Sequence, residues 1–348
     1  MMDATTISFN FTDNATDYFL PTDETEEDTD QIIFQVTKIL AILFDSVAFF
    51  LGTLGNGLVI WIAGFNMRKS VSIIWLLNLA FTDLLLNIFL ALQIVEEIMD
   101  GHWAFNPVMC NMVLTAVSLN MSTSAVFEMI ISIDHCVTVT CPKWSGNHRT
   151  PKLALVISIL IWIICSIFTF PDFAFSGIAH DLDNDFSYCA PVYAEDLHAF
   201  SWYQAMYFVR FIFVFLIPLT VMFLSHGLLL HWQRKNKSLS GSSQPFKRSV
   251  TTILCFFCMW FPFYLWPFLQ FMDIEISFQV DLILSNIVFA LGFIDSCINP
   301  IIYAFSGRDF KGGILKSFPF LLESTFHEND ETKTQRDQIV VETVIRQT

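Results

Sequence analysis

The chain has 348 residues, of which 54% are hydrophobic and only 15% are charged, and its mean hydropathy is +0.55. An ordinary soluble domain carries about 25% charged residues, so this chain is poor in the groups that keep a surface wet. The composition excludes a disordered chain, a small disulfide-stapled secreted protein and most soluble enzymes. It indicates a protein that crosses a membrane several times, and the net charge of −15 makes the placement of its charges informative.

The first segment of the chain, residues 1–36, contains nine acidic residues and neither Lys nor Arg. It lacks the apolar core of a removable signal peptide, so the first apolar span is expected to direct insertion. Two glycosylation sequons begin at Asn10 and Asn14, which predicts that the segment is extracellular. Tyr18 has acidic neighbours, and both sulfation and an unmodified tyrosine are consistent with that setting.

Seven apolar stretches follow, each long enough to cross about 30 Å of hydrocarbon as a helix. They cover residues 37–64, 72–98, 108–133, 153–171, 203–231, 248–272 and 282–305. The predicted fold is an all-α membrane protein: a bundle of seven transmembrane helices over residues 37–305. A cytoplasmic tail over residues 306–348 completes the chain.

The basic residues predict the orientation of the bundle. Sixteen of the 18 Lys and Arg lie at 68–69, 143–152, 234–248 and in the tail, on one side of the membrane if the spans alternate. The opposite side holds 21 of the 33 acidic residues and no Lys or Arg. The positive-inside rule therefore predicts a plasma-membrane protein with an extracellular N-terminus. Of the eight cysteines, Cys110 and Cys189 are those expected on the oxidising side, and hence the expected disulfide.

Several polar residues lie inside the predicted spans, where ionisable groups are costly and therefore functional candidates. One set would meet if spans two, three and seven pack together: Asp83, Asn120, Ser124, Asp295 and Asn299. Oxygen ligands around a carboxylate suit a hard cation such as Na⁺, and the alternative is a hydrogen-bonded network with water and no ion. Glu128 continues the same helical face, and these acids cannot all stay charged without a base nearby. No other cofactor is expected.

Each of the seven spans carries a short motif. In chain order these are Gly55-Asn56, Leu79 to Asp83, Cys110 with Asp134, Trp162, Pro218, Trp260-Phe261-Pro262 and Asn299-Pro300 to Tyr303. The series resembles that of rhodopsin-like G-protein-coupled receptors, and Phe310 resembles a residue of the short amphipathic eighth helix in that family. Strings at 101–105, 144–150 and 305–310 resemble the chemoattractant group, which includes formyl-peptide, chemerin and anaphylatoxin receptors.

The resemblance implies a receptor for an extracellular peptide or small protein, with roles in chemotaxis and inflammation. Its partners would be a G protein, usually of the inhibitory class, and arrestin. It also implies a Na⁺ site at the polar cluster and a role in activation for Asp134, Pro262, Asn299, Pro300 and Tyr303. Basic residues on the cytoplasmic side could in addition meet lipid phosphates.

The chain departs from the family at the inner ends of two spans. The family's Asp-Arg-Tyr reads Asp134-His135-Cys136, and His135 lacks the guanidinium fork expected to contact the G protein. His226 stands where span five usually has a Tyr, and Glu128 replaces an apolar residue that seals the resting core. Weakened coupling is one interpretation. A decoy that internalises its ligand with little coupling is another, and a histidine pH or metal switch is a third.

Apart from Lys38 at the outer end of span one, Arg210 is the only Lys or Arg in the outer half of the predicted bundle, which is otherwise acidic. It could bind an anionic group of the ligand, or pair internally with Asp45, Asp172 or Glu96. The acidic entrance favours a cationic ligand, so a basic peptide or protein with a carboxylate end is predicted. Further predicted ligand contacts are Glu96, Ser118, Trp260 and Phe289. Because Ser118 and Glu96 differ from the corresponding residues of formyl-peptide receptors, formyl peptides are not the first expectation.

Other classes of membrane protein are less favoured. The sequence shows no duplicated halves typical of transporters and no ring of like residues typical of channel filters. It contains no metal box or nucleophile motif at membrane depth, so an enzyme is not expected. Nucleic acid is not an expected partner either.

Overall fold

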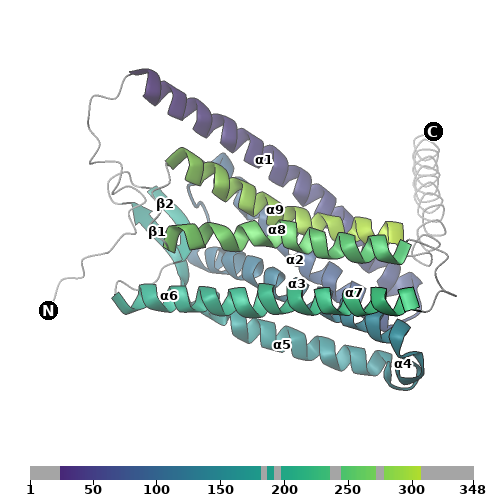
Figure 1. The fold of residues 1–348 in the computed structure, drawn as a ribbon. Coiled ribbons are helices and arrows are strands. Elements are labelled where there is room, and N and C mark those ends of the chain that lie inside the picture. The colour runs from purple at the N-terminus through teal and green to yellow at the C-terminus, as the bar shows by residue number, and fades with distance from the viewer. Residues whose placement is uncertain (1–23, 182–185, 192–196, 236–243, 272–277, 307–348) are drawn as a thin grey trace, which may run out of the picture.

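The computed structural model describes residues 24–181, 186–191, 197–235, 244–271 and 278–306, and its long helices run side by side along a common axis (Figure 1). The first helices are α1 (Glu24–Trp61), continued by a π-helix (Ile62–Asn66), α2 (Val71–Ile98), α3 (Pro107–Thr140), α4 (Pro142–His148) and α5 (Pro151–Phe175). A hairpin of β1 (Ser176–Asp181) and β2 (Phe186–Pro191) follows. The last helices are α6 (Leu197–Arg210), joined by a π-helix (Phe211–Leu216) to α7 (Ile217–Lys235), then α8 (Gln244–Phe271) and α9 (Phe278–Ser306).

The seven predicted spans all lie in helices, in the predicted order. Among the described residues, six helical stretches are long and apolar enough to cross a membrane, and α8 contains a shorter apolar stretch, Ile253–Trp266. The fifth span runs without a break from α6 through the π-helix into α7. Two helices are longer than their apolar stretches, since α1 begins at Glu24 and α3 ends at Thr140. Helical backbone bonds do not require apolar side chains, so hydropathy alone underestimates these lengths.

The helices begin where the sequence provides caps. Asn106 precedes Pro107, and its side chain accepts a hydrogen bond from the backbone N–H of Met109 at 2.9 Å. Thr150 precedes Pro151 and caps α5 in the same way. A polar N-cap followed by proline at the first helical position is a strong start signal, because proline lacks the N–H that the helix would leave unpaired.

Helix α5 shows how the bundle separates its lipid-facing and packed sides. Its buried residues recur every three or four positions, as in one face of a helix, and are Ala154, Ser158, Ile161, Cys165 and Thr169. On the other side, Ile163, Ile164 and Ile167 are half to two-thirds exposed. In water such a stripe would drive association, whereas in a bilayer it faces hydrocarbon.

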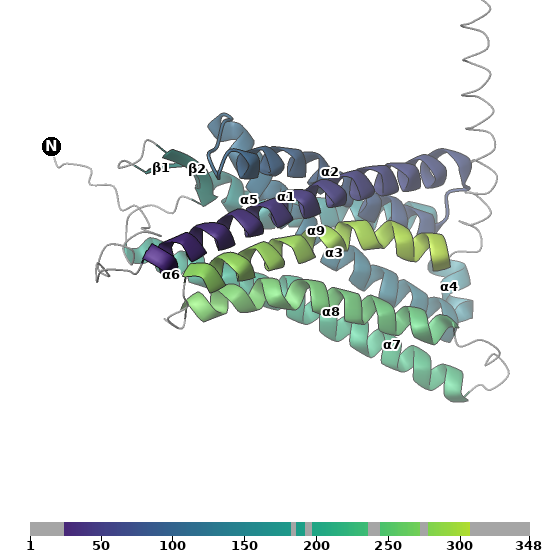
Figure 2. The ribbon, with the colours of Figure 1, turned by 90° about the horizontal axis from the view of Figure 1, so that it is seen from above.

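The two ends of the bundle differ in structure (Figures 1 and 2). At one end, called the hairpin end here, β1 and β2 pair antiparallel with Ile178 opposite Cys189. Cys189 forms a disulfide with Cys110 at the start of α3, as predicted. The buried Trp103 donates its backbone N–H to the carbonyl of Ser187 at 2.7 Å, which fixes the loop before α3 against β2. At the other end, called the α4 end, α4 turns the chain from α3 into α5.

Close contacts between α1 and its neighbours depend on glycine. A side chain at Gly52 would collide with Asn87 of α2, and a Cβ at Gly55 would lie 3.2 Å from Cγ of Pro300 in α9. Glycine therefore lets α1 approach both helices. Asn10, Asn14, Tyr18 and Phe310 lie outside the described residues, and so does the predicted eighth helix.

Candidate functional site

A polar centre lies between α2, α3 and α9, around the buried carboxylate of Asp83. Asn120 donates from Nδ2 to Oδ1 of Asp83 at 3.0 Å, and Oγ of Ser124 donates to the same oxygen at 3.4 Å. Asn299 donates to Oδ2 at 2.9 Å. Asn120 and Ser124 are four residues apart, so one face of α3 supplies both. The structure thus brings four of the five residues predicted to hold a cation into direct contact.

Further polar contacts connect this centre to α1. Asn87 donates from Nδ2 to Oγ of Ser296 at 3.0 Å, and Asn56 donates to the backbone carbonyl of Ser296 at 2.9 Å. Sequence analysis missed Asn87, although it lies four residues after Asp83 and hence on the same face of α2. The four-residue spacing from Asp83 could have predicted that Asn87 lies near this centre.

Two more buried carboxyl groups lie beside the centre. Glu128 continues the stripe of Asn120 and Ser124 along α3, and Asp295 lies on α9 within interaction range of Trp260. Oε2 of Glu128 and Oδ2 of Asp295 find no hydrogen-bond partner within the described part of the chain. A buried carboxyl oxygen without a hydrogen-bond donor is costly, so a cation or a further donor beside these oxygens would be stabilising.

The hydrogen bonds around Asp83 determine what a bound Na⁺ ion would have to replace. Both of its oxygens accept hydrogen bonds from amide or hydroxyl donors, so the centre as built is a hydrogen-bond network. A Na⁺ ion would have to replace at least one of those donors. Among the described residues, no three or more His, Cys, Asp or Glu side chains are grouped to hold a metal ion. Asp83, Asn120, Ser124 and Asn299 supply carboxylate, amide and hydroxyl oxygens, the donor types that hard cations accept.

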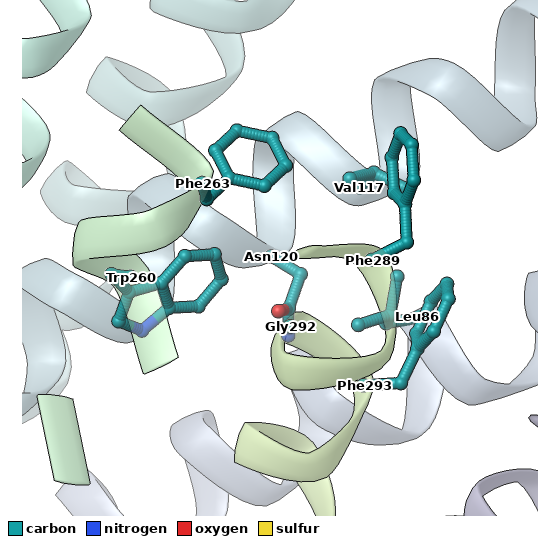
Figure 3. Close-up of a pocket in the computed structure, with 8 residues that line it drawn as sticks. All are labelled: Leu86, Val117, Asn120, Trp260, Phe263, Phe289, Gly292 and Phe293. Atoms are coloured by element: carbon teal, nitrogen blue, oxygen red, sulfur yellow. The ribbon is translucent and has the colours of Figure 1, made fainter. Parts of the chain in front are cut away.

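A small cavity of about 10 Å³ lies next to the polar centre (Figure 3). Its lining comes from α2, α3, α8 and α9: Leu86, Val117, Asn120, Trp260, Phe263, Phe289, Gly292 and Phe293. Leu86 and Val117 lie about one turn closer to the hairpin end than Asp83 and Asn120. Asn120 belongs both to the cavity lining and to the Asp83 network, so a ligand group that widened this cavity would contact the network through one side chain.

The predicted ligand contacts are divided between this cavity and other places. Trp260 and Phe289 line the cavity, whereas Arg210, Glu96 and Ser118 are not among its described lining residues. Glu96 accepts a hydrogen bond from the backbone N–H of Cys189 at 3.2 Å, which ties the hairpin to α2.

Arg210, at the end of α6, forms an ion pair with Asp172 of α5 through Nη2 and Oδ2. Asp172 was one of the three internal partners considered from the sequence. The exposed fractions of the two side chains are only 15% and 11%. Nε of Arg210 is buried and meets no acceptor among the residues that the structure describes. Another candidate partner, Asp45, interacts instead with Glu97.

A second ion pair closes the α4 end. Arg149 donates from Nε to Oδ1 of Asp134 at 2.7 Å and from Nη2 to Oδ2 at 2.8 Å. Its Nη2 also reaches Oγ of Ser72, at the start of α2, at 2.6 Å. The hydrogen bond with Asp134 raises the pKa of Arg149 above its ordinary value. Sequence analysis had placed Arg149 only among the basic loop residues, and no spacing rule signalled this partner.

The remaining residues predicted to take part in activation lie next to Asp134 or on α7, α8 and α9. His135 is half-buried beside Asp134, Cys136 is buried, and His226 is buried on α7. Pro262 and Pro300 lie within α8 and α9. Tyr303 belongs to the helical part of α9, and its side chain lies outside the described set.

Residues 55–303 match the family model described as "7 transmembrane receptor (rhodopsin family)", and they include the last two turns of α1, the second to sixth spans and all but the last three residues of α9. The chain belongs to this receptor family. The predicted family, the seven-helix bundle and the expectation of a receptor rather than an enzyme are thereby confirmed. With its apolar helices, the receptor is a multi-pass plasma-membrane protein.

Known relatives of the receptor belong to the chemoattractant group. It is 34% identical to human "Chemerin-like receptor 1" over 297 residues, which are 82% of this chain and 79% of that receptor. It is 34% identical to mouse "Formyl peptide receptor-related sequence 1" over 313 residues, 86% of this chain and 89% of that one. Identity to human "N-formyl peptide receptor 3" is 31% over 328 residues, 90% and 92% of the two chains.

Proposed function

We propose that the receptor binds an extracellular basic peptide or small protein with a carboxylate end, and that it couples to an inhibitory-class G protein. The observation that carries this proposal is the aromatic cavity on the polar centre. Asn120 lines the cavity and donates to Asp83, which in turn accepts from Asn299 of α9. A ligand group that moves Asn120 therefore alters the link that runs from α3 through Asp83 of α2 to α9, which is the kind of coupling that a receptor needs.

Two classes of ligand are suggested by the relatives, whose names refer to chemerin and to formyl peptides. Formyl peptides are less favoured because Ser118 and Glu96 depart from the pattern of the receptors that bind them. Glu96 is also engaged with the hairpin backbone. Chemerin is accordingly the first probe, and Arg210 is the residue proposed to receive its terminal carboxylate.

Coupling to the G protein is proposed to be weakened. His135 cannot present a guanidinium to a partner, and the acid beside it, Asp134, is held by Arg149 instead. The same observation favours a second candidate function, a decoy receptor that takes up ligand without signalling. Arg149 pairs with Asp134 at the α4 end, so an arginine other than the one the family places at residue 135 holds this acid.

The proposal includes the surroundings of the receptor. The hairpin end would face outwards and the α4 end the cytoplasm, where arrestin would bind. Lys143 and Lys152 lie at the α4 end, where cations attract anionic lipid headgroups. Na⁺ would bind at Asp83 and stabilise the resting arrangement of α2, α3 and α9.

The test uses cells that express the wild type, His135→Arg or Arg210→Ala at equal surface levels. Uptake of labelled chemerin and inhibition of cAMP are read together. Uptake with a partial cAMP response that His135→Arg strengthens is the expected result. Uptake with a silent wild type, restored by His135→Arg, supports the decoy. A full wild-type response that His135→Arg leaves unchanged contradicts both versions, and unaltered uptake by Arg210→Ala contradicts the role of Arg210.

A further inference from the structure

Arg210 and Arg149 use the same edge of the guanidinium group, but only one of them uses it fully. Arg149 directs Nε and Nη2 to the two oxygens of Asp134. Arg210 directs Nη2 to one oxygen of Asp172, while its Nε is buried without an acceptor among the described residues. The paired use of Nε and Nη2 by a single carboxylate is the favoured geometry for arginine. Asp172 therefore occupies half of a site that a carboxylate can fill.

The surroundings of Arg210 make its Nε costly to leave without an acceptor. Tyr264 lies within electrostatic range of Arg210, and its ring packs with Tyr207 and Phe211. The hydroxyl of Tyr207 donates to the backbone carbonyl of Tyr264, so this wall is fixed. A guanidinium next to an aromatic wall has little water to satisfy it, and an unpaired N–H there costs free energy. A carboxylate that reached both Nε and Nη2 would remove that cost.

The backbone on both sides of the pair is irregular. Asp172 directly follows Pro171, which supplies no N–H to the helical ladder of α5. Arg210 is the last residue of α6 before the π-helix Phe211–Leu216. π-helical turns inside transmembrane helices are frequent at functional sites. The pair thus joins two helices at points where each departs from the regular α-helical pattern.

We propose that the carboxylate of Asp172 occupies the site of the ligand's carboxylate in the ligand-free receptor, where it accepts from Nη2 of Arg210. On binding, the ligand's carboxylate displaces Asp172 and accepts from both Nε and Nη2. This inference rests on the proposed function, because it concerns the same Arg210 site. It also defines the ligand further. Displaced Asp172 would be a poorly hydrated anion, so the ligand must bring a basic group beside its carboxylate to compensate it. A free carboxylate with a neighbouring Lys or Arg side chain is the chemistry that meets both needs.

The first test needs no peptide. Asp172→Ala removes the internal carboxylate and leaves room for a small external one, so sodium acetate should restore thermal stability to this variant. Thermal unfolding of the purified receptor is followed in rising sodium acetate and in sodium chloride of equal ionic strength. We expect a saturable acetate-specific rise in the melting temperature of Asp172→Ala, and none in Asp172→Ala/Arg210→Gln. Asp172→Asn serves if Asp172→Ala does not fold, since its amide oxygen can still accept from Nη2.

Two controls make the acetate test specific. The wild type should respond to acetate and chloride alike, because Asp172 already holds Nη2. Asp100→Asn removes the acid of another ion pair at the hairpin end, with Lys38, and should show no acetate effect because that site is exposed. If acetate stabilises the Asp172 variants no more than chloride does, Arg210 cannot take an external carboxylate and the inference is overturned.

The second test uses chemerin with a free or an amidated carboxyl end as the probe. Asp172→Asn should bind the free acid about tenfold more tightly than the wild type, because no internal carboxylate has to be displaced. Its affinity for the amide should stay unchanged, and Arg210→Gln should abolish the preference for the acid. An equal gain for acid and amide contradicts the inference. Absence of any chemerin binding would contradict the proposed ligand while the acetate result still decides the role of Asp172.

Discussion

The two Arg–Asp ion pairs at opposite ends of the bundle are built from the same residue types and differ in how many guanidinium contacts they make. At the α4 end, Arg149 binds Asp134 through both of its side-on nitrogens and reaches Ser72 as well. At the hairpin end, Arg210 binds Asp172 through one nitrogen and leaves Nε buried without an acceptor in the described structure. The first pair uses both nitrogens of the Nε–Nη2 edge, whereas the second leaves Nε of that edge unused.

This difference in guanidinium contacts indicates a different role for each ion pair. A saturated bidentate pair gains geometric specificity and resists rearrangement, which suits a joint that holds helices together. A little-exposed pair in which one guanidinium N–H has no acceptor can still bind another carboxylate, which suits a site that exchanges partners. The first pair joins the end of α3 to the chain before α5 and to α2, and the second joins α5 to α6.

The largest effect is expected where a buried charge loses its partner. Asp172→Ala should lower the free energy of unfolding by about 3 kcal/mol, because it leaves the guanidinium of Arg210 uncompensated. Asp172→Ala/Arg210→Gln should recover most of that loss, since both charges are then gone. Unfolding of the purified receptor in mixed micelles measures both values. A double variant no more stable than Asp172→Ala would mean that the charge of Arg210 is not the cause.

A smaller loss, about 2 kcal/mol, is expected for Arg149→Ala, because this pair is more exposed but makes three hydrogen bonds. Arg149→Lys should recover less than half, since an ammonium cannot bind two oxygens side-on. Lys143→Ala on α4 is the matched control and should change stability by less than about 0.5 kcal/mol. If Arg149→Lys were as stable as the wild type, charge alone would explain the pair and the contrast with Arg210 would lose its basis.

The raised pKa of Arg149 gives this pair a defined pH dependence. A cation with a raised pKa contributes stability that is complete below its ordinary value and is lost only as the pH rises through the raised one. The difference between wild type and Arg149→Ala should therefore be constant between about pH 7 and 9, far below the ordinary pKa of arginine. Paired unfolding curves at three pH values in that interval test this, and a difference that shrinks steadily with pH would contradict it.

A still smaller effect should follow from restoring the family's arginine. In His135→Arg the new side chain can compete with Arg149 for Asp134, so the cost of Arg149→Ala should fall by about 1 kcal/mol in that background. A double-mutant cycle with the four variants measures this coupling. Coupling near zero would mean that residue 135 cannot reach Asp134, and that the pair at the α4 end is independent of the family motif.

Much of the architecture could be predicted from the sequence because hydropathy reports membrane burial directly. The seven spans are helical in the predicted order, and Cys110 and Cys189 form the disulfide that the distribution of basic residues implied. Four-residue spacing placed Asn120 and Ser124 on one face of α3, and both reach Asp83. Hydropathy, residue spacing within a helix and the side of the membrane are properties of single helices. They can be predicted from the sequence without knowing which helices pack together.

Contacts between helices were less predictable, since they depend on rotation and packing that no single span records. Asp172 was one of three equal candidates for Arg210, and Arg149 was not suspected as the partner of Asp134. The aromatic lining of the cavity includes Trp260 and Phe289, as predicted, but the separation of Arg210 from that lining was not foreseen. The choice among several acids around one arginine is a question of geometry, and only the packed bundle answers it.

The smallest effect is expected at a third ion pair, between Lys38 and Asp100, which provides a reference for the other two. Nζ of Lys38 lies 2.5 Å from Oδ1 of Asp100, as short a contact as any at the α4 end, but the Asp100 side chain is 63% exposed. Lys38 also reaches the carbonyl of Ile98 at 3.3 Å, so it keeps one acceptor when the acid is removed. Water and salt screen such a pair, and Asp100→Asn should change the free energy of unfolding by less than about 0.5 kcal/mol. A loss as large as that of Asp172→Ala would mean that proximity, rather than burial and completeness of the guanidinium contacts, ranks the three pairs.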